Sequence, residues 1–408
     1  MFKRCQRLHS VLLGLLAGVA LLCLFGHNGA AAAVPSGQVT PVRFTAEYYA
    51  GLNERFGVGF AAGALVFDNG ITRTAHITDY DVGLLHIGWY SDWGTHREPL
   101  RPGDIEYAQL IPVRASRYPT NTLHLTETVE ANHGALWIIG NEPEAKYGQG
   151  KRTPEQYAEI YHDMYMLIKG TESEPGLDRS AWIAIGGVIE PTPLRLEWLN
   201  RVLSHYQVTY GGPMPVDVWN IHVQILQEVA GTPQDPDPPG AEIPTGLSAT
   251  QGMLYTWADN ANPVVFQQLV TDFRQWMKDN GFQDKPLIIS EYGVLYPSWL
   301  LADNDEPRGD QMVIHFLRET FNFLVSATDA DLGYPADGYR LVQQWLWYSL
   351  NGQAFDETST RGFNGGLFDY WDATRMTRFG AVFREYVHVL MGYPRVMLPG
   401  IVKLASPG

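Results

Sequence analysis

Eight short apolar runs alternate with amphipathic stretches along this 408-residue sequence. Most of the runs are almost continuously apolar and rich in Ile, Val, Leu and Trp, which is typical of strands buried on both faces of a parallel sheet. We therefore expect strands at 56–61, 82–89, 105–113, 136–140, 182–188, 216–221, 287–290 and 341–347. Eight strands that alternate with helices predict an α/β protein with a single-domain (β/α)8 TIM barrel.

Helix signals lie between several of these runs. Thr153, Pro154 and Gln156 form a capping pattern in front of apolar residues at helical spacing. A second helix is expected to begin after Asn262, and 311–325 and 379–390 are expected to form further helices. The rival architecture, an open doubly wound sheet, is disfavoured because no glycine-rich stretch has the G-x-G-x-x-G spacing.

The first 33 residues have the pattern of a secretory signal peptide. A basic start is followed by an apolar run at 11–25 and by small residues that offer a cleavage site at 31–33. The apolar run is shorter than the roughly 20 residues that span a bilayer, so a retained membrane anchor is the alternative. We expect a secreted or extracytoplasmic protein with an N-terminal lead-in at 34–55 and one folded domain at 56–408.

Cysteine content and charge exclude several classes of function. Cys5 and Cys23 are the only cysteines and both lie in the leader, so the mature chain would have no disulfide, cysteine nucleophile or thiolate metal site. The 29 basic and 44 acidic residues give a net charge of −15, so no nucleic-acid partner is expected. We expect no metal and no cofactor, and the serine-hydrolase motif G-x-S-x-G is absent.

Two of the expected strands run directly into a glutamate. The fourth leads into Glu142 and the seventh into Glu291. A charged glutamate beside a buried strand costs several kcal/mol in desolvation unless it is paired, so it has little structural value there. At the carboxyl end of a barrel strand it would instead face a substrate. The two residues are therefore the candidate catalytic pair.

The motifs Gly140-Asn141-Glu142-Pro143 and Ser290-Glu291-Tyr292-Gly293 resemble the two catalytic motifs of clan A glycoside hydrolases. Within that clan the chain is most similar to the alkali-sensitive-linkage type glycosyl hydrolase catalytic core family, which includes β-1,3-glucanases. The segments 88–94 and 217–222 are similar to its second and sixth strands. The resemblance implies a retaining hydrolase that cleaves β-glycosidic bonds in a polysaccharide or oligosaccharide, β-glucans among them, with 56–408 as the catalytic domain.

The resemblance also implies individual roles. Glu142 would be the acid/base and Glu291 the nucleophile, which agrees with the need for one protonated and one ionised carboxyl group. Asn141 would bond the 2-hydroxyl of the sugar, unless it only caps the turn. His222 would contact the sugar or orient the nucleophile, unless it is a histidine of the rim. Tyr292 would contact the carboxylate or the sugar, unless it only packs.

Tryptophans near strand ends are candidate platforms for a sugar ring. We expect Trp347 to lie under the reactive sugar, with Trp345 as the alternative, because the two share one face of a strand. Trp89 and Trp93 are also expected at the substrate. The clan often has an aromatic residue at the position occupied by Gln224, and this departure leaves the local subsite open.

The longest irregular segment, at about 229–262, contains five prolines. It follows the sixth expected strand, so in a barrel it would overhang the mouth in which active sites lie. The alternative is a tolerated surface insertion. A non-catalytic glycan-binding or surface-adhesion barrel is the competing function, and the presence of both glutamates disfavours it.

Overall fold

The computed structural model describes residues 52–68, 71–114, 122–146, 150–232, 240–356 and 362–393. The expected signal peptide, Cys5, Cys23, most of the lead-in and part of the proline-rich loop lie outside these residues. Within the described ranges, no helix is long and apolar enough to cross a membrane.

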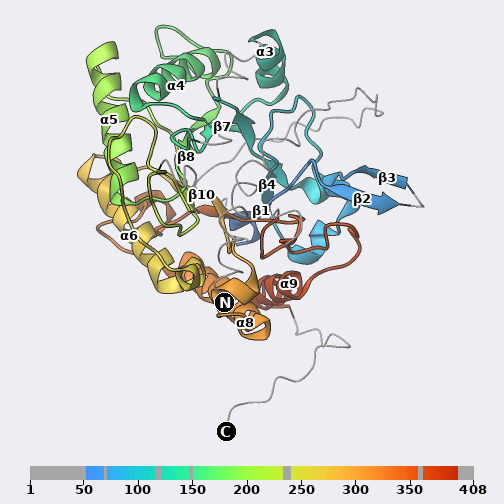
Figure 1. The fold of residues 1–408 in the computed structure, drawn as a ribbon. Coiled ribbons are helices and arrows are strands. Elements are labelled where there is room, and N and C mark those ends of the chain that lie inside the picture. Colours follow the sequence, from blue (N-terminus) through green and yellow to red (C-terminus); the bar gives the residue numbers. More distant parts are fainter. Residues whose placement is uncertain are drawn as a thin grey trace.

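Parallel strands close into a barrel, and Figure 1 shows the helices in a ring around them. The strands are β1 (Phe56–Gly59), β4 (Trp89–Ser91), β5 (Glu106–Tyr107), β6 (Gln109–Ile111), β7 (Leu136–Asn141), β8 (Trp182–Gly187), β9 (Trp219–Val223), β10 (Leu287–Tyr292) and β11 (Gln344–Trp347). Hydrogen bonds link them in the orders β5-β4-β1-β11-β10-β9 and β6-β7-β8, and parallel bridges join β8 to β9. Because β5 and β6 occupy one barrel position, the predicted (β/α)8 barrel is confirmed.

The helices are α3 (Thr122–Ala131), α4 (Pro154–Ile168), α5 (Pro193–Tyr210), α6 (Pro263–Asp279), α7 (Ser298–Leu301), α8 (Glu306–Ser326) and α9 (Arg378–Leu390). The capping box at Thr153 is present, and the Asn262 side chain caps α6. Helix α8 begins earlier than expected, at a cap formed by Asp305.

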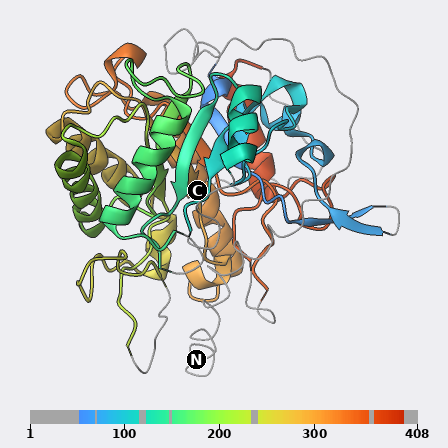
Figure 2. The ribbon, with the colours of Figure 1, turned by 90° about the horizontal axis from the view of Figure 1, so that it is seen from above.

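The second expected strand is wrong over most of its length. Val82–Leu85 forms a short 3-10 helix, and β4 begins only at Trp89. The i, i+3 spacing of Val82 and Leu85 places both side chains in the core from one helical turn. The sixth and eighth strands likewise begin three residues later than expected. A hairpin of β2 (Leu65–Asp68) and β3 (Ile71–Thr74), which the sequence analysis missed, projects from the barrel (Figure 2).

The strands separate two apolar layers. One cluster fills the barrel interior and includes Trp89, Leu110, Ile138, Val218, Ile288 and Leu346. The larger cluster lies between the strands and the helices and includes Trp345 and Trp347. Neighbouring residues of one strand therefore face opposite layers, so both faces of these strands are apolar.

Candidate active site

Glu142 follows β7 at a turn with a left-handed backbone. Gly140 has φ +97° and Glu142 has φ +41°. A residue with a side chain pays about 1–2 kcal/mol for such a conformation, so contacts around the turn must hold it. The Glu142 amide donates to the Gly187 carbonyl at 3.0 Å, and its own carbonyl accepts from the Ala145 amide at 3.0 Å. The turn thus presents Glu142 at the carboxyl end of the barrel.

Glu291 lies within β10, where the register with both neighbouring strands shifts. Its Oε2 accepts a hydrogen bond from Trp93 Nε1 at 3.0 Å, and its Oε1 accepts one from Gln224 Nε2 at 2.8 Å. Burial is the main cause that raises the pKa of Glu291 to about 7, while His222 and the two donors act in the opposite direction. Two fixed donors favour the ionised carboxylate and hold it in one orientation.

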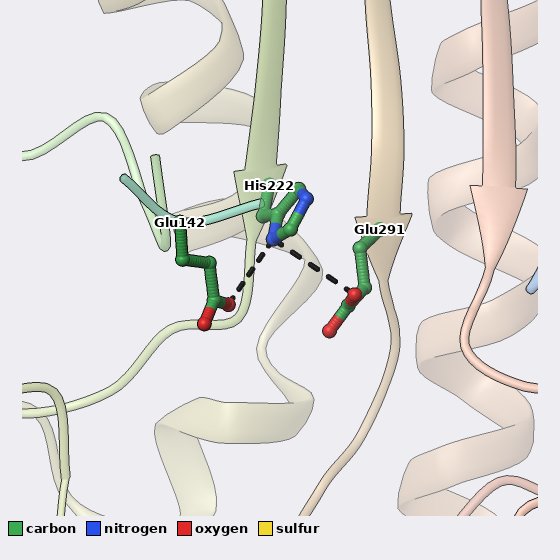
Figure 3. A group of neighbouring side chains, drawn as sticks. All are labelled: Glu142, His222 and Glu291. Atoms are coloured by element: carbon green, nitrogen blue, oxygen red, sulfur yellow. Dashed lines mark hydrogen bonds and ion pairs between the residues drawn. The ribbon is translucent and has the colours of Figure 1, made fainter. Parts of the chain in front are cut away.

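His222, at the end of β9, lies between the two carboxylates (Figure 3). Its Nδ1 is 3.2 Å from Glu142 Oε1 and 4.0 Å from Glu291 Oε2. Burial favours the neutral imidazole, but the charges of Glu291 and Glu142 outweigh it and raise the pKa of His222. The ring fits because residue 187 is a glycine, whose added Cβ would lie 2.5 Å from the imidazole Cδ2.

The carboxylates themselves are close together. One oxygen of Glu142, one oxygen of Glu291 and a ring nitrogen of His222 all lie within 4.8 Å of one another. Two carboxylates at this distance repel when both are ionised, so the geometry favours different roles for the two side chains. The site can therefore offer an acid and a nucleophile at the same time.

These three residues are also the candidate metal ligands in the described part of the chain. Motif searching cannot find such a set, because its members come from three strands far apart in the sequence. Both oxygens of Glu291 already accept N–H bonds from Trp93 and Gln224. These bonds hold the carboxylate in one orientation and leave a second lone pair on each oxygen.

Asn141 and Trp93 lie beside the two glutamates. Asn141 is partly exposed at the end of β7, and its buried Oδ1 has no hydrogen-bond partner among the described residues. Trp93 follows β4 with φ +59° and reaches Glu291 through its indole N–H. The first could bond a sugar hydroxyl, while the second acts on the carboxylate.

Trp347 does not lie at the site, and neither does Trp345. Both side chains are fully buried on the outer face of β11. Trp347 donates to the Gly365 carbonyl at 2.8 Å and packs edge-on against Tyr292, with a centroid distance of 5.4 Å. The two tryptophans share a face as expected, but it is the face toward the helices, so the expected platform is wrong.

Tyr292 and Trp89 are also placed differently from the expectation. Tyr292 is fully buried among outer-layer aromatics, with its ring 5.0 Å from that of Phe266. Trp89 lies inside the barrel and donates to the carbonyl of Arg55, which precedes β1 at the amino end. Both are packing residues, because their strands direct them away from the two glutamates.

Two residues of the site were missed. Gln224 was noted only as the lack of an aromatic, yet its amide donates to Glu291. Tyr348 follows Trp347 on the opposite face, and its ring lies 5.6 Å from that of Trp93. Burial and the nearby charges of Glu291 and Glu142 raise the pKa of the Tyr348 hydroxyl. A signal was present in the alternation along β11, but it needed knowledge of which face is inside.

No protein-family model matches this sequence, and no curated protein matches it. Solved structures of low sequence identity do resemble it. An endo-β-1,3-glucanase of GH128 subgroup II from Sorangium cellulosum is 12% identical, with 81% of this chain and 97% of that chain covered and a TM-score of 0.47. A curdlan-specific exo-β-1,3-glucanase of GH128 subgroup III from Blastomyces gilchristii, solved with glucose, is 13% identical, with 81% and 97% covered and a TM-score of 0.47.

An oligosaccharide-binding protein of GH128 subgroup VII from Trichoderma gamsii is 10% identical, with 76% of this chain and 92% of that chain covered and a TM-score of 0.44. The similar structures thus include both hydrolases and a binding protein, and carbohydrate is their common ligand. At these identities and TM-scores, no activity transfers to this chain, and its barrel is established by its own strand order.

Proposed function

We propose that this chain is a retaining glycoside hydrolase that cleaves β-glycosidic bonds in a polysaccharide or oligosaccharide. The observation that carries the proposal is the distance between carboxylate oxygens of Glu142 and Glu291, which lies within 4.8 Å. Retaining enzymes hold their two carboxyl groups about 5–5.5 Å apart, whereas inverting enzymes need about 6.5–9.5 Å to admit a water. The spacing supports direct attack by one carboxylate.

The contacts of the two glutamates support different roles. Glu291 suits the nucleophile, because both of its oxygens accept N–H bonds that hold it in one orientation, and with His222 these bonds lower its pKa against the larger effect of burial. Glu142 suits the acid/base, because its buried Oε2 has no hydrogen-bond partner in the described part of the chain and so has no competing bond to give up to a glycosidic oxygen. The nearby His222 faces the other oxygen of Glu142 and keeps the carboxyl group in place.

The reaction then proceeds in two displacements. Glu142 donates its proton to the leaving oxygen while a Glu291 oxygen attacks the anomeric carbon, which forms a glycosyl ester and releases the first product. The ionised Glu142 next takes a proton from water, whose oxygen attacks the same carbon and releases Glu291. Two inversions retain the anomeric configuration, and Glu142 ends protonated as it began.

Two features of the sequence support further parts of this proposal. The signal-peptide pattern of the N-terminal segment supports export, so the substrate would be an extracytoplasmic glycan. The resemblance of the segments 88–94 and 217–222 to the alkali-sensitive-linkage family supports β-glucans as the first substrates to test. The competing function, glycan binding without turnover, is supported only by the similarity of fold to an oligosaccharide-binding protein.

The stereochemistry of the first product tests the proposal. Proton NMR of wild-type hydrolysis should show a product with the anomeric configuration of the substrate before mutarotation. Glu291→Ala should be nearly inactive, and azide with an activated aryl glycoside should restore turnover and give the glycosyl azide of opposite configuration. Glu385→Ala, in an exposed ion pair on the outer face of α9, is the matched control with wild-type activity.

Two results would contradict this assignment. Inversion by the wild-type protein would exclude Glu291 as the nucleophile. Binding of glycans with no hydrolysis across a β-glycan panel, unaffected by either glutamate variant, would favour the binding protein.

A further inference from the structure

A second cluster of buried charges lies beside the two glutamates and has Arg195 at its centre. Arg195, in the first turn of α5, is fully buried. Its Nε donates to Glu144 Oε1 at 2.9 Å, its Nη1 donates to Glu228 Oε1, and its Nη2 donates to the Glu242 carbonyl at 3.1 Å. The guanidinium thus donates to three residues of two separate loops, a geometry that its planar fork permits.

Both loops lie at the carboxyl ends of strands. Glu144 belongs to the loop after β7, while Glu228 and Glu242 belong to the long proline-rich loop after β9. Glu144 Oε1 also accepts the amide of Ile189 at 2.8 Å, which adds the loop after β8. The Glu144 carbonyl accepts the amide of Thr245 at 2.9 Å, so the long loop is tied directly to this turn as well.

The cluster cannot hold its arrangement without the arginine. Glu144 and Glu228 are both fully buried, and an unpaired buried carboxylate is strongly unfavourable. Glu190, also fully buried, adds a third acid near Arg195, and burial raises the pKa of Glu190 to about 8. Loss of the guanidinium would therefore force the acids apart or force them to take up protons, and the loops that carry them would shift.

One of these acids belongs to the turn that carries the candidate acid/base. Glu144 is two residues from Glu142, whose left-handed backbone needs outside support. The hydrogen bonds from Arg195 and Ile189 hold the Glu144 side chain at the end of that turn. Within the turn, the Glu142 carbonyl accepts hydrogen bonds from the Ala145 amide at 3.0 Å and the Gly150 amide at 3.2 Å. A displacement of Glu144 would therefore move the backbone of Glu142, which lies in the same turn.

We infer that Arg195 is a positioning residue for Glu142, and that through Glu228 it ties the proline-rich loop to the placement of this acid/base. The inference rests on the proposed function, because positioning matters only if Glu142 transfers a proton. This role explains why the buried Arg195 lies among three buried glutamates, Glu144, Glu190 and Glu228, next to the site. The long loop then belongs to the catalytic machinery and is not a tolerated insertion.

The test compares Arg195→Lys with Arg274→Lys. Both arginines are fully buried, but Arg274 lies on α6 and bonds the Lys285 carbonyl and Gln343 Oε1 at the amino end of the barrel. Lysine keeps the charge and loses the fork, so Arg195→Lys should misplace the acid. Hydrolysis of glycosides with poor leaving groups should fall about 10- to 100-fold, because small misplacements of a catalytic group cost that much.

The leaving group separates positioning from general damage. Aryl glycosides with good leaving groups need little protonation, so Arg195→Lys should slow their first step less than about threefold. Arg274→Lys should slow both substrate types equally. Glu144→Gln is the second variant if Arg195→Lys does not fold, since it weakens the bond between residues 144 and 195 and preserves the size of the side chain. It should show the same dependence on the leaving group.

The outcomes distinguish the two proposals. If the wild type hydrolyses glycosides and the Arg195 and Glu144 variants slow poor and good leaving groups alike, Arg195 has only a structural role and the inference is wrong. If the wild type hydrolyses no glycoside, the proposed function fails and the inference fails with it. A selective loss on poor leaving groups in both variants, absent from Arg274→Lys, supports it.

Discussion

The two ends of the barrel bury charge in different ways. At the amino end, Arg55 and Asp337 form a two-pronged ion pair with both distances 2.7 Å, and Gln343 donates to the same carboxylate. At the carboxyl end, Arg195 faces Glu144, Glu228 and Glu190. The Arg55–Asp337 pair is balanced charge for charge, whereas the cluster around Arg195 has an excess of acids. Balanced pairs suit a structural role, whereas unmatched buried acids are costly and indicate function.

The largest expected difference between the ends is in catalysis. Glu142→Gln should lower hydrolysis of unactivated glycans about 10²- to 10⁴-fold, the usual contribution of a general acid. Its free energy of unfolding should be unchanged or higher, because one of two repelling buried carboxylates is removed. Steady-state kinetics and urea unfolding measure the two quantities. Cleavage of native glycans at the wild-type rate would remove Glu142 from the acid/base role.

At the amino end we expect the opposite result, a loss of stability without a loss of activity. Asp337→Asn leaves the buried Arg55 without its carboxylate, and breaking such a pair costs about 3–5 kcal/mol. The kcat of the folded fraction should equal that of the wild type, since neither residue contacts the site. The matched change at the other end is Glu190→Gln, which should cost little below pH 8, where burial already keeps this carboxyl protonated. Equal loss of unfolding free energy in the two variants would show that the two ends of the barrel do not differ in this way.

The carboxyl end should also make stability depend on pH. Burial raises the pKa of Glu291 to about 7 and that of Glu190 to about 8, both above the value near 4.5 of an unfolded chain. The folded state therefore binds protons more tightly, so this stability is fully present below pH 4.5 and is lost as the pH rises through 7 and 8. Each tenfold difference in proton affinity corresponds to about 1.4 kcal/mol.

Thermal unfolding between pH 5 and 9 measures this loss. The wild-type melting temperature should fall toward alkaline pH, and Glu190→Gln should remove the part of the fall that lies near pH 8. An identical alkaline fall in this variant would show that Glu190 does not titrate there. Asp337→Asn should shift the whole curve down and preserve its alkaline slope.

The sequence predicted the barrel and the two glutamates because both depend on local patterns. A buried parallel strand is apolar throughout, and a charged residue at its end stands out against that background. The same property hides which face is inside. Trp345 and Trp347 could be assigned to one face of β11, but continuous apolarity gives no sign that this face meets the helices and that Tyr348 faces the site.

The rest of the site depends on contacts between distant segments. Gln224 donates to Glu291 from the position after β9, and its value as a donor could not be seen where an aromatic residue was expected. Arg195 has no local pattern at all, because its partners at 144, 228 and 242 converge only when two loops fold over the barrel. The prediction of the second strand was wrong for a local reason, because Val82 and Leu85 reach the core equally well from a helical turn.

The glycine at residue 187 constrains how the site can evolve. An added Cβ would clash with the imidazole of His222, 35 positions later in the sequence, at 2.5 Å from its Cδ2, so the histidine requires the glycine. Any lineage that keeps the histidine must also keep the glycine, whatever else diverges around them. A glycine and a histidine at the ends of adjacent strands, read together with the two glutamate motifs, form a signature by which remote kin of this chain can be sought when overall identity has faded.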